Sequence, residues 1–193
     1  MNHDPLIVVL AGPNGAGKTT VAPALLQGAY AVDEFVNADT IATGLSAFRP
    51  EAAAIAAGRV MLQRLDALAA ARRDFAFEST LSARSFAPWL RVQRMAGYRV
   101  HVVFLALPDA EAAVIRVADR VRRGGHDIPA GVIRRRYVAG LRNFHALYRP
   151  LASSWQVYDN GGEDGPALIA EQVEGGPVVV LDPGVWAGLE VTR

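Results

Sequence analysis

The sequence predicts an α/β fold with a central, mostly parallel sheet of five to six strands. The apolar, β-branched run Leu6–Ala11 reads as a strand buried on both faces, which is typical of parallel sheets. Short apolar runs then alternate along the chain with stretches of helical periodicity, and this alternation favours parallel strands joined by right-handed crossovers. The 193 residues contain no internal repeat or low-complexity linker, so we expect one domain over residues 1–193.

Local patterns place the individual elements. The strand candidates after the first are residues 35–37, 75–77, 98–107 and 156–158, with 177–181 as a last strand or edge element. The predicted helices cover residues 18–27, 50–72, 87–96, 109–122 and 129–148. The last of these carries an apolar stripe with steps of four and three residues, formed by Ile133, Tyr137, Leu141, Phe144 and Tyr148. Residues 160–165 are expected to form a loop.

Composition excludes several classes of protein. Hydrophobic residues make up 51% and charged residues 20% of the chain, which suits a soluble globular protein. The net charge of +1 gives no bias toward nucleic acid or an anionic membrane. The absence of cysteine excludes disulfides and thiolate metal sites. The N-terminus lacks signal-peptide features and no apolar run is long enough to span a bilayer, so we expect a cytoplasmic protein.

The segment from Gly12 to Thr19 matches the pattern G-x-x-x-x-G-K-[ST], and it lies between a predicted strand and a predicted helix. Its glycines let successive backbone N–H groups point inward at phosphate oxygens, and the following helix adds its positive N-terminal end. Lys18 is the one lysine among 20 basic residues, so a chain that otherwise uses arginine places a compact ammonium here. A glycine-rich turn that fits the pattern by chance would leave this exception unexplained.

This motif predicts a site for ATP and Mg²⁺. Lys18 is expected to reach the β- and γ-phosphates, and the hydroxyl of Thr19 is expected to ligate the metal. The predicted nucleotide-binding residues are Gly12, Pro13, Asn14, Gly15, Ala16, Gly17, Lys18, Thr19 and Thr20.

Two carboxylates follow predicted strands, where functional groups collect in a parallel sheet. Asp39 comes shortly after the strand at 35–37, and Glu78 comes directly after the strand at 75–77. Either side chain could accept a substrate proton or hold Mg²⁺, directly or through water. The structural alternatives are a helix cap for Asp39, or for Asn37 in its place, and a buried ion pair for Glu78.

Nine of the chain's arginines fall between Arg116 and Arg149, on two predicted helices joined by a segment that contains Gly124–Gly125. Such a cluster suits a helical lid, over about residues 116–137, whose guanidinium groups close over phosphates. The alternative is a solvated helix face whose arginines pair with Asp109, Glu111 and Asp119.

Other chemistry is not favoured. The four histidines, His3, His101, His126 and His145, do not show metal-ligand spacing, and His145 is expected at the surface of the long helix. Ser79 lacks a nucleophile elbow. The chain has no wide basic field or exposed aromatic platform, so we expect no nucleic-acid partner.

Together these segments resemble the zeta toxin family of small P-loop kinases, in particular its short chromosomal branch. The resemblance is carried by AGPNGAGKTT (11–20), VNAD (36–39), FEST (77–80) and RVRRGGHDIP (120–129), with IRRRY (133–137) and VYDN (157–160) as further matches. It implies a three-layer, nucleoside-kinase-like P-loop NTPase fold with an arginine-rich helical lid.

The resemblance also implies an activity, the transfer of the γ-phosphate of ATP to a sugar hydroxyl of UDP-N-acetylglucosamine. Asp39 would be the base that activates the acceptor hydroxyl. Glu78, Ser79 and Thr80 would line the substrate and metal region. Arg120, with Arg135 or Arg136, would contact phosphates from the lid, and of the latter two we take Arg136. Lys18, Asp39, Arg120 and Arg136 are thus the predicted catalytic residues. An antitoxin protein would be a partner.

Three other functions stay open from the residues. The acceptor could be another hydroxyl compound, such as a nucleoside, an antibiotic or a different sugar. The chain could be an ATP-dependent switch that hydrolyses ATP slowly, although a switch does not need the acceptor base that Asp39 offers. A nucleic-acid kinase would bind oligonucleotides with a steep dependence on salt.

Overall fold

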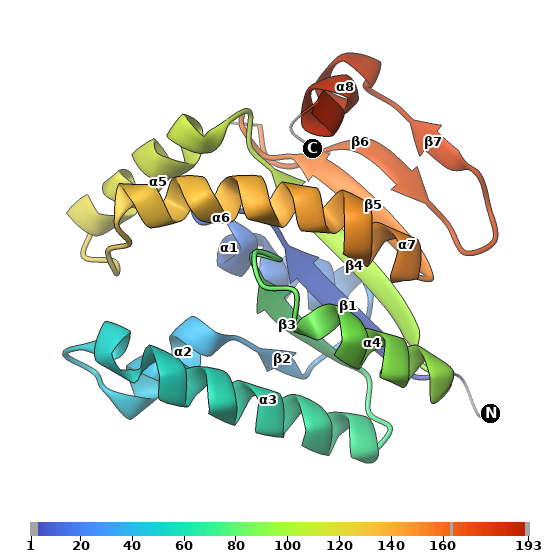
Figure 1. Cartoon of the computed structure of the whole chain (residues 1–193), viewed down its shortest axis with the longest axis horizontal. Helices are drawn as coiled ribbons and strands as arrows, with labels where there is room; N and C mark the ends of the chain where they lie inside the picture. Colours follow the sequence, from blue (N-terminus) through green and yellow to red (C-terminus); the bar gives the residue numbers. More distant parts are fainter. Residues whose placement is uncertain (1–3, 163, 192–193) are drawn as a thin grey trace.

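The computed structural model describes residues 4–162 and 164–191, and it confirms the predicted α/β class (Figure 1). A seven-stranded sheet has the order β2-β3-β1-β4-β5-β6-β7. The strands are β1 Leu6–Ala11, β2 Phe35–Val36, β3 Phe75–Ser79, β4 Arg99–Ala106, β5 Ser154–Asp159, β6 Ala167–Gln172 and β7 Val178–Val180. The five strands from β2 to β5 in the sheet are parallel, whereas β6 and β7 are antiparallel additions beside β5.

Helices cover both faces of this sheet, which gives the expected three layers (Figure 1). The helices are α1 Lys18–Pro23, α2 Ala38–Leu45, α3 Ala54–Ala70, α4 Phe86–Met95, α5 Ala110–Arg122, α6 Ala130–Asn143, α7 Arg149–Leu151 and α8 Pro183–Val191. Three further helical segments are the π-helical η1 Ala24–Ala29, the 3-10 turn η2 Pro50–Ala53 and the π-helical η3 Phe144–Tyr148. Helices α1 and η1 form one continuous helix, as do α6 and η3.

Aromatic contacts show which elements pack on each face. Phe77 of β3 and Phe104 of β4 lie on the same face, where they contact Phe86 of α4 and Phe144 of η3, with ring centroids 5.1 and 4.8 Å apart. The opposite face of β4 carries His101, and Tyr30 at the end of η1 packs over it. Strand β1 lies between these layers, and its four central residues, Ile7, Val8, Val9 and Leu10, are fully buried. The continuous apolar run therefore reflects a central strand, as predicted.

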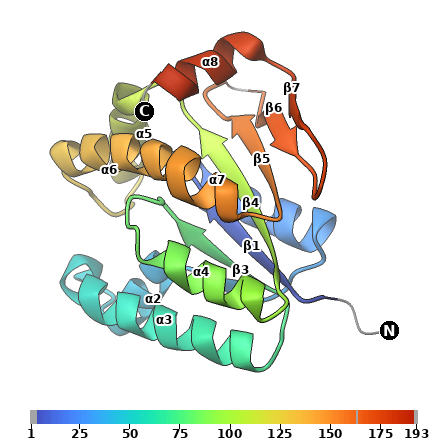
Figure 2. The ribbon, with the colours of Figure 1, turned by 45° about the vertical axis from the view of Figure 1, so that its right-hand side comes forward.

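The C-terminal part of the described chain differs most from the sequence prediction. Strand β6 and helix α8 were not expected, and α8 packs over the β5–β6 side of the sheet (Figure 2). Trp186 of α8 stacks on Trp155 of β5 with an interplanar angle of 7°. His145, expected at the surface, is instead buried, because its ring lies against Phe144 and Trp186. Within the described ranges, no helix is both long and apolar enough to cross a bilayer.

Candidate active site

The parallel strands end together at one edge of the sheet, and the predicted site residues meet there. Ala11, the last residue of β1, lies beside Ser79 of β3 and Phe104 of β4. The loop after β1, the end of β3, the start of α2 and the residues after β5 therefore share this edge. This is the position at which open α/β sheets bind ligands.

The loop between β1 and α1 has the backbone of a phosphate cradle. Gly15 and Gly17 adopt left-handed φ angles of 80°, a conformation that favours glycine. The side chain of Asn160, just after β5, donates from its Nδ2 to the Ala16 carbonyl at 2.7 Å. A β-carbon at Gly17 would lie 2.8 Å from the same Asn160 Nδ2 atom. Asn160 thus fixes the loop from the far side of the sheet edge, and it needs a glycine at position 17 to do so.

Lys18 lies inside this loop rather than in solvent. Its side chain is buried, and its Nζ atom donates to the carbonyls of Gly12 and Pro13, each at 2.9 Å. Nζ also lies 3.5 Å from Oε1 of Glu78. Burial lowers the pKa of Lys18, and the neighbouring Glu78 carboxylate opposes this effect. The ammonium is thus held at the phosphate cradle by oxygen atoms that bind its charged form.

Glu78 binds three side chains, two from the start of α1 and one from the cap of α2. Its Oε2 atom accepts from the Thr19 hydroxyl at 2.9 Å and from Asn37 Nδ2 at 2.8 Å, while Oε1 faces Lys18. A buried ion pair is the structural alternative for Glu78, and its partner in the structure is Lys18. Because this pair joins Lys18 of the phosphate-loop motif to the end of β3, the ion pair and a role in the site describe the same arrangement.

Asp39 lies in the first turn of α2, with Asn37 as the cap of the helix. Asn37 Oδ1 accepts from the backbone N–H groups of Asp39 and Thr40 at 2.7 and 3.1 Å. The capping alternative therefore applies to Asn37, and the Asp39 carboxylate is left exposed at the positive end of the helix. The same Asn37 side chain bonds Glu78, so one amide sets the relative positions of both carboxylates.

The arginine-rich helices α5 and α6 border the same edge. Arg120 Nη2 donates to the His126 carbonyl at 2.7 Å, while its buried Nε meets no hydrogen-bond partner among the described residues. Gly125 gives this side chain its space, since a β-carbon there would lie 2.6 Å from Arg120 Cγ. Arg116 donates from its Nη2 to the Gly161 carbonyl at 3.0 Å.

The three consecutive arginines of α6 have different surroundings. Arg134 forms a two-point ion pair with Glu111 of α5, with N–O distances of 2.6 and 2.8 Å. This matches the solvated-face alternative, as does the Arg122–Asp119 pair. Arg135 is exposed, whereas Arg136 is half-buried and lines a cleft beside Asp39.

Two clefts of substrate size open at the sheet edge. The first, of about 600 Å³, runs along the phosphate loop, and we call it the donor cleft. Its walls include Gly15, Lys18, Thr19, Arg116, Arg120 and Arg123. The second, of about 530 Å³, lies between α3, the segment after β3, and α6, and we call it the acceptor cleft. Its walls include Arg59, Leu62, Ser79, Thr80, Phe86 and Arg136.

The two clefts meet at three side chains. Asn14, Asp39 and Glu78 line both the donor and the acceptor cleft. Asn14 is 8% exposed, and its Oδ1 atom has no hydrogen-bond partner within the described chain. The predicted residues Lys18, Thr19 and Arg120 thus lie on the donor side, while Ser79, Thr80 and Arg136 lie on the acceptor side.

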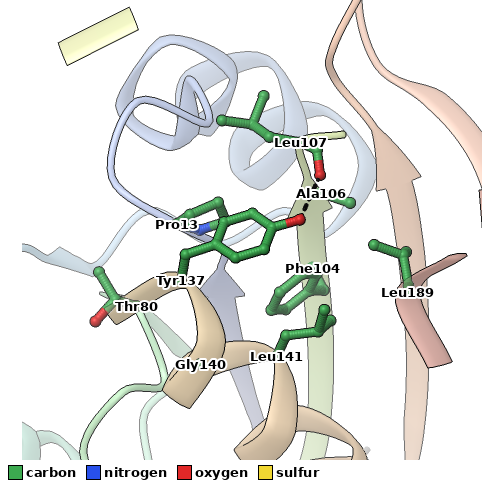
Figure 3. A pocket seen from close by; sticks show the side chains of 9 residues that line it. All are labelled: Pro13, Thr80, Phe104, Ala106, Leu107, Tyr137, Gly140, Leu141 and Leu189. Carbon is green, nitrogen blue, oxygen red and sulfur yellow. Dashed lines mark hydrogen bonds between the residues drawn. The ribbon is translucent and has the colours of Figure 1, made fainter. Parts of the chain in front are cut away.

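A small apolar cavity of about 10 Å³ separates α6 from the phosphate loop (Figure 3). Pro13 of the loop faces Tyr137 of α6 there, and the Tyr137 hydroxyl donates to the Leu107 carbonyl at 2.9 Å. Gly140 of α6 lies against the Thr80 carbonyl, where a β-carbon would approach to 2.3 Å. Close packing therefore positions α6 over the loop and over the segment after β3.

Sequence reasoning missed several residues of this site. The role of Asn37 in linking Asp39 to Glu78 depends on a contact between α2 and β3 that no local pattern indicates. Asn160 lies within the recognised segment VYDN, which is a signal for it. Arg59 had no signal, because an exposed arginine on a helix is ordinary.

The chain is similar to a known family and to a protein of another organism. The family model described as Zeta toxin matches residues 1–164. An uncharacterised protein of Haemophilus influenzae is 28% identical over 130 residues, which cover 67% of this chain and 91% of that protein.

Solved structures share the fold at lower identity. One comes from a study of the PezAT chromosomal toxin–antitoxin system of Streptococcus pneumoniae, with 16% identity, a TM-score of 0.67, and 99% of this chain and 86% of that chain covered. Another is the AvrRxo1-ORF1:AvrRxo1-ORF2 complex with ATP, with 18% identity and a TM-score of 0.76. The match covers 100% of this chain but only 65% of the AvrRxo1 chain, so this chain spans about two thirds of its length.

Proposed function

Given that this chain belongs to the zeta toxin family, and is thus an ATP-dependent phosphotransferase, we propose that it transfers the γ-phosphate of ATP to a sugar hydroxyl of UDP-N-acetylglucosamine. One observation carries the proposal. A cleft with a phosphate cradle and a second cleft of substrate size meet at Asn14, Asp39 and Glu78. An ATP-dependent switch needs the first cleft but has no use for the second.

The acceptor cleft supports a substrate that combines an anionic group with rings. Arg59 of α3 and Arg136 of α6 stand on its walls, and neither forms an ion pair with another described residue. Unpaired guanidinium groups favour phosphate oxygens, which a sugar nucleotide supplies. Phe86 and Leu62 offer apolar surface beside them. The nucleoside, antibiotic and other sugar acceptors remain alternatives within the same reaction class.

In the proposed mechanism, Asp39 accepts the proton of the acceptor hydroxyl. Its carboxylate stands where the clefts join, with its backbone fixed by Asn37. Lys18 and Arg120 neutralise charge on the transferred phosphoryl group from the donor side. Positioning by the two clefts supplies much of the remaining acceleration.

The residues around Thr19 fit a Mg²⁺ ion. The Thr19 hydroxyl lies 2.9 Å from the Glu78 carboxylate, so two oxygen ligands of the preferred kind are already adjacent. Mg²⁺ typically uses one or two protein oxygens together with phosphates and water. When bound, the ion supplies charge neutralisation and orientation of the phosphates. We propose that Thr19 ligates the ion directly. Glu78 would position the ion through its hydrogen bond to Thr19 or through a bound water.

The direct experiment incubates the protein with Mg-ATP and UDP-N-acetylglucosamine and follows both products by mass spectrometry. We expect the sugar nucleotide to gain one phosphate and ADP to form in equal amount. UDP-glucose and free N-acetylglucosamine are matched controls for the acetamido group and for the diphosphate. ADP release without any phosphorylated acceptor would contradict the proposal and favour the switch.

We also propose that a protein antitoxin inhibits this enzyme. The support is that one matched structure comes from a toxin–antitoxin study and another from a two-protein complex. Copurification of a second protein with the tagged chain from its native host, and release of kinase activity on their separation, would test this.

A further inference from the structure

We propose that Asn14 is a further catalytic residue, whose side-chain amide binds the γ-phosphoryl group at the point of transfer. This inference deepens the proposed function and rests on it for the identity of the acceptor. It assigns a side-chain role to a position that the phosphate-loop pattern leaves variable, since only the glycines, the lysine and the hydroxyl of that pattern are specified.

The first observation is the burial of Asn14 without a partner. The residue is 8% exposed, and its Oδ1 atom meets no hydrogen-bond donor in the described part of the chain. Buried side-chain amides in native proteins are rarely unpaired, and an unpaired one calls for an explanation such as a catalytic role or a bound ligand. Because no hydrogen bond from the described residues fixes Oδ1, this carboxamide can turn to present its NH₂ group to a ligand.

The second observation is the location of Asn14. It lines the donor and the acceptor cleft together with Asp39 and Glu78, so it borders the path between the two substrates. Both other side chains at this junction are carboxylates, which cannot donate a hydrogen bond to phosphate. Asn14 is the member of the three that can.

Asn160 shows what a buried amide with a purely structural role looks like here. It is 9% exposed, close to the value for Asn14, and it also belongs to the surroundings of the phosphate loop. Its Nδ2 atom is paired with the Ala16 carbonyl, and its backbone N–H with the Ala106 carbonyl. The paired amide of Asn160 supports the loop, whereas we assign the unpaired amide of Asn14 to contact with the ligand.

The proposed role of Asn14 adds no bond change or proton transfer to the phosphoryl-transfer step. The acceptor oxygen forms a bond to the γ-phosphorus, and the bond between that phosphorus and the β,γ-bridging oxygen breaks. The electron pair of the broken bond stays on ADP, and the hydroxyl proton passes to Asp39. Asn14 gains and loses no proton, and its NH₂ group donates to a non-bridging γ-oxygen throughout.

The test compares binding of ADP and of the non-hydrolysable β,γ-imido analogue of ATP by calorimetry, for the wild type and for Asn14→Ala, Asn14→Asp and Asn160→Ala. We expect Asn14→Ala to leave the ADP Kd within about twofold and to weaken the analogue about tenfold, the size of one hydrogen bond to a charged group. Asn14→Asp, which keeps the shape but turns a carboxylate toward the γ-phosphate, should weaken the analogue more. Asn160→Ala should weaken both ligands in parallel.

Equal weakening of ADP and the analogue by Asn14→Ala, or no weakening of either, would overturn the assignment. Thermal unfolding of each variant shows that it is folded, and the isosteric Asn14→Asp carries the test if Asn14→Ala is not. These measurements need no acceptor. Failure of the wild type to phosphorylate UDP-N-acetylglucosamine would therefore sink the proposed function and leave the Asn14 result standing.

Discussion

At the scale of single residues, Glu78 organises the site through its two oxygens. One faces the Lys18 ammonium, and the other accepts from Thr19 and Asn37. Asp39 is bound to this group only through the Asn37 amide, so its own carboxylate stays available. Two carboxylates at one sheet edge thus have different surroundings, as expected when one organises charge and the other handles a proton.

Replacement of Asp39 by Asn should separate binding from transfer. We expect Asp39→Asn to lower kcat by about 10²- to 10⁴-fold, the usual contribution of a general base, with the Kd of ATP nearly unchanged. Rates of acceptor phosphorylation and calorimetric binding of ATP measure the two quantities. Ser85→Ala, on the acceptor wall but away from the junction, is the matched control. Full transfer activity in Asp39→Asn would show that another group takes the proton.

The sequence identifies residues whose chemistry is unusual for their surroundings. Lys18 stands out in a chain of arginines, and Asp39 and Glu78 stand out as carboxylates close to strand ends, although Glu78 lies within β3 and not after it as predicted. Asn37 and Asn160 do not, because an amide near a strand end is ordinary until the partner 41 or 144 residues away is known. The sequence likewise does not decide which of Arg134, Arg135 and Arg136 faces the site. Only the position of α6 distinguishes the arginine that pairs with Glu111 from the one that lines the acceptor cleft.

At the scale of elements, α6 is the helix whose placement matters most for the site. It carries Arg136 to the acceptor cleft, and its Tyr137 and Gly140 fix it against Leu107 and Thr80. The close contact between α6 and the Thr80 carbonyl leaves no space for a larger side chain at Gly140.

Two glycines of α6 offer a matched pair of substitutions. Gly140→Ala would place a β-carbon 2.3 Å from the Thr80 carbonyl, so α6 or the segment after β3 has to move. We expect a loss of about 1–3 kcal/mol in the free energy of unfolding and weaker acceptor binding. At Gly131 a β-carbon meets nothing within 4 Å, so Gly131→Ala should be neutral or stabilise the helix by about 0.5–1 kcal/mol. Urea unfolding measures both, and equal effects would contradict the packing argument.

Elements with strong periodicity were predicted well, and elements with contrary composition were not. The continuous apolar run of β1 and the apolar stripe of the helix from α6 into η3 each indicate one type of secondary structure. Strand β6, ALIAEQ, is rich in residues that are depleted in strands, and its pairing with β5 overrides that preference. Helix α8 begins Pro-Gly and contains a second glycine, so local propensity argues against it until Trp186 packs on Trp155.

At the scale of the whole molecule, the two ends of the sheet serve different purposes. The carboxyl edge of the parallel strands holds both clefts. Toward the other end, His101 of β4 bonds Tyr30 and Ser154, and Tyr30 bonds Gln156. Gln156 in turn donates to Glu171 of β6, so this buried network connects η1 with three strands.

This network makes stability depend on pH. Burial lowers the pKa of His101 from 6.5 to about 4, against the opposing effects of Gln156 and Glu171. Between these values the unfolded chain binds a proton that the folded chain does not, so stability is complete above pH 6.5 and falls as the pH drops toward 4. The loss should reach about 3 kcal/mol, at about 1.4 kcal/mol per pH unit.

Urea unfolding of the wild type and of His101→Gln over this pH range isolates the effect, because the carboxylates titrate alike in both. The difference in unfolding free energy between the two proteins should shrink as the pH falls. A difference that is constant with pH would show that His101 does not titrate in this range.

The meeting of the two clefts at Asn14, Asp39 and Glu78 also bears on the order of events during turnover. Beyond these three residues, the walls of the two clefts are formed by different side chains. If ATP and the acceptor occupy these clefts as proposed, we expect that neither has to bind before the other. The order of binding would then depend on the concentrations and affinities of the two ligands, and the fold would not impose an ordered mechanism.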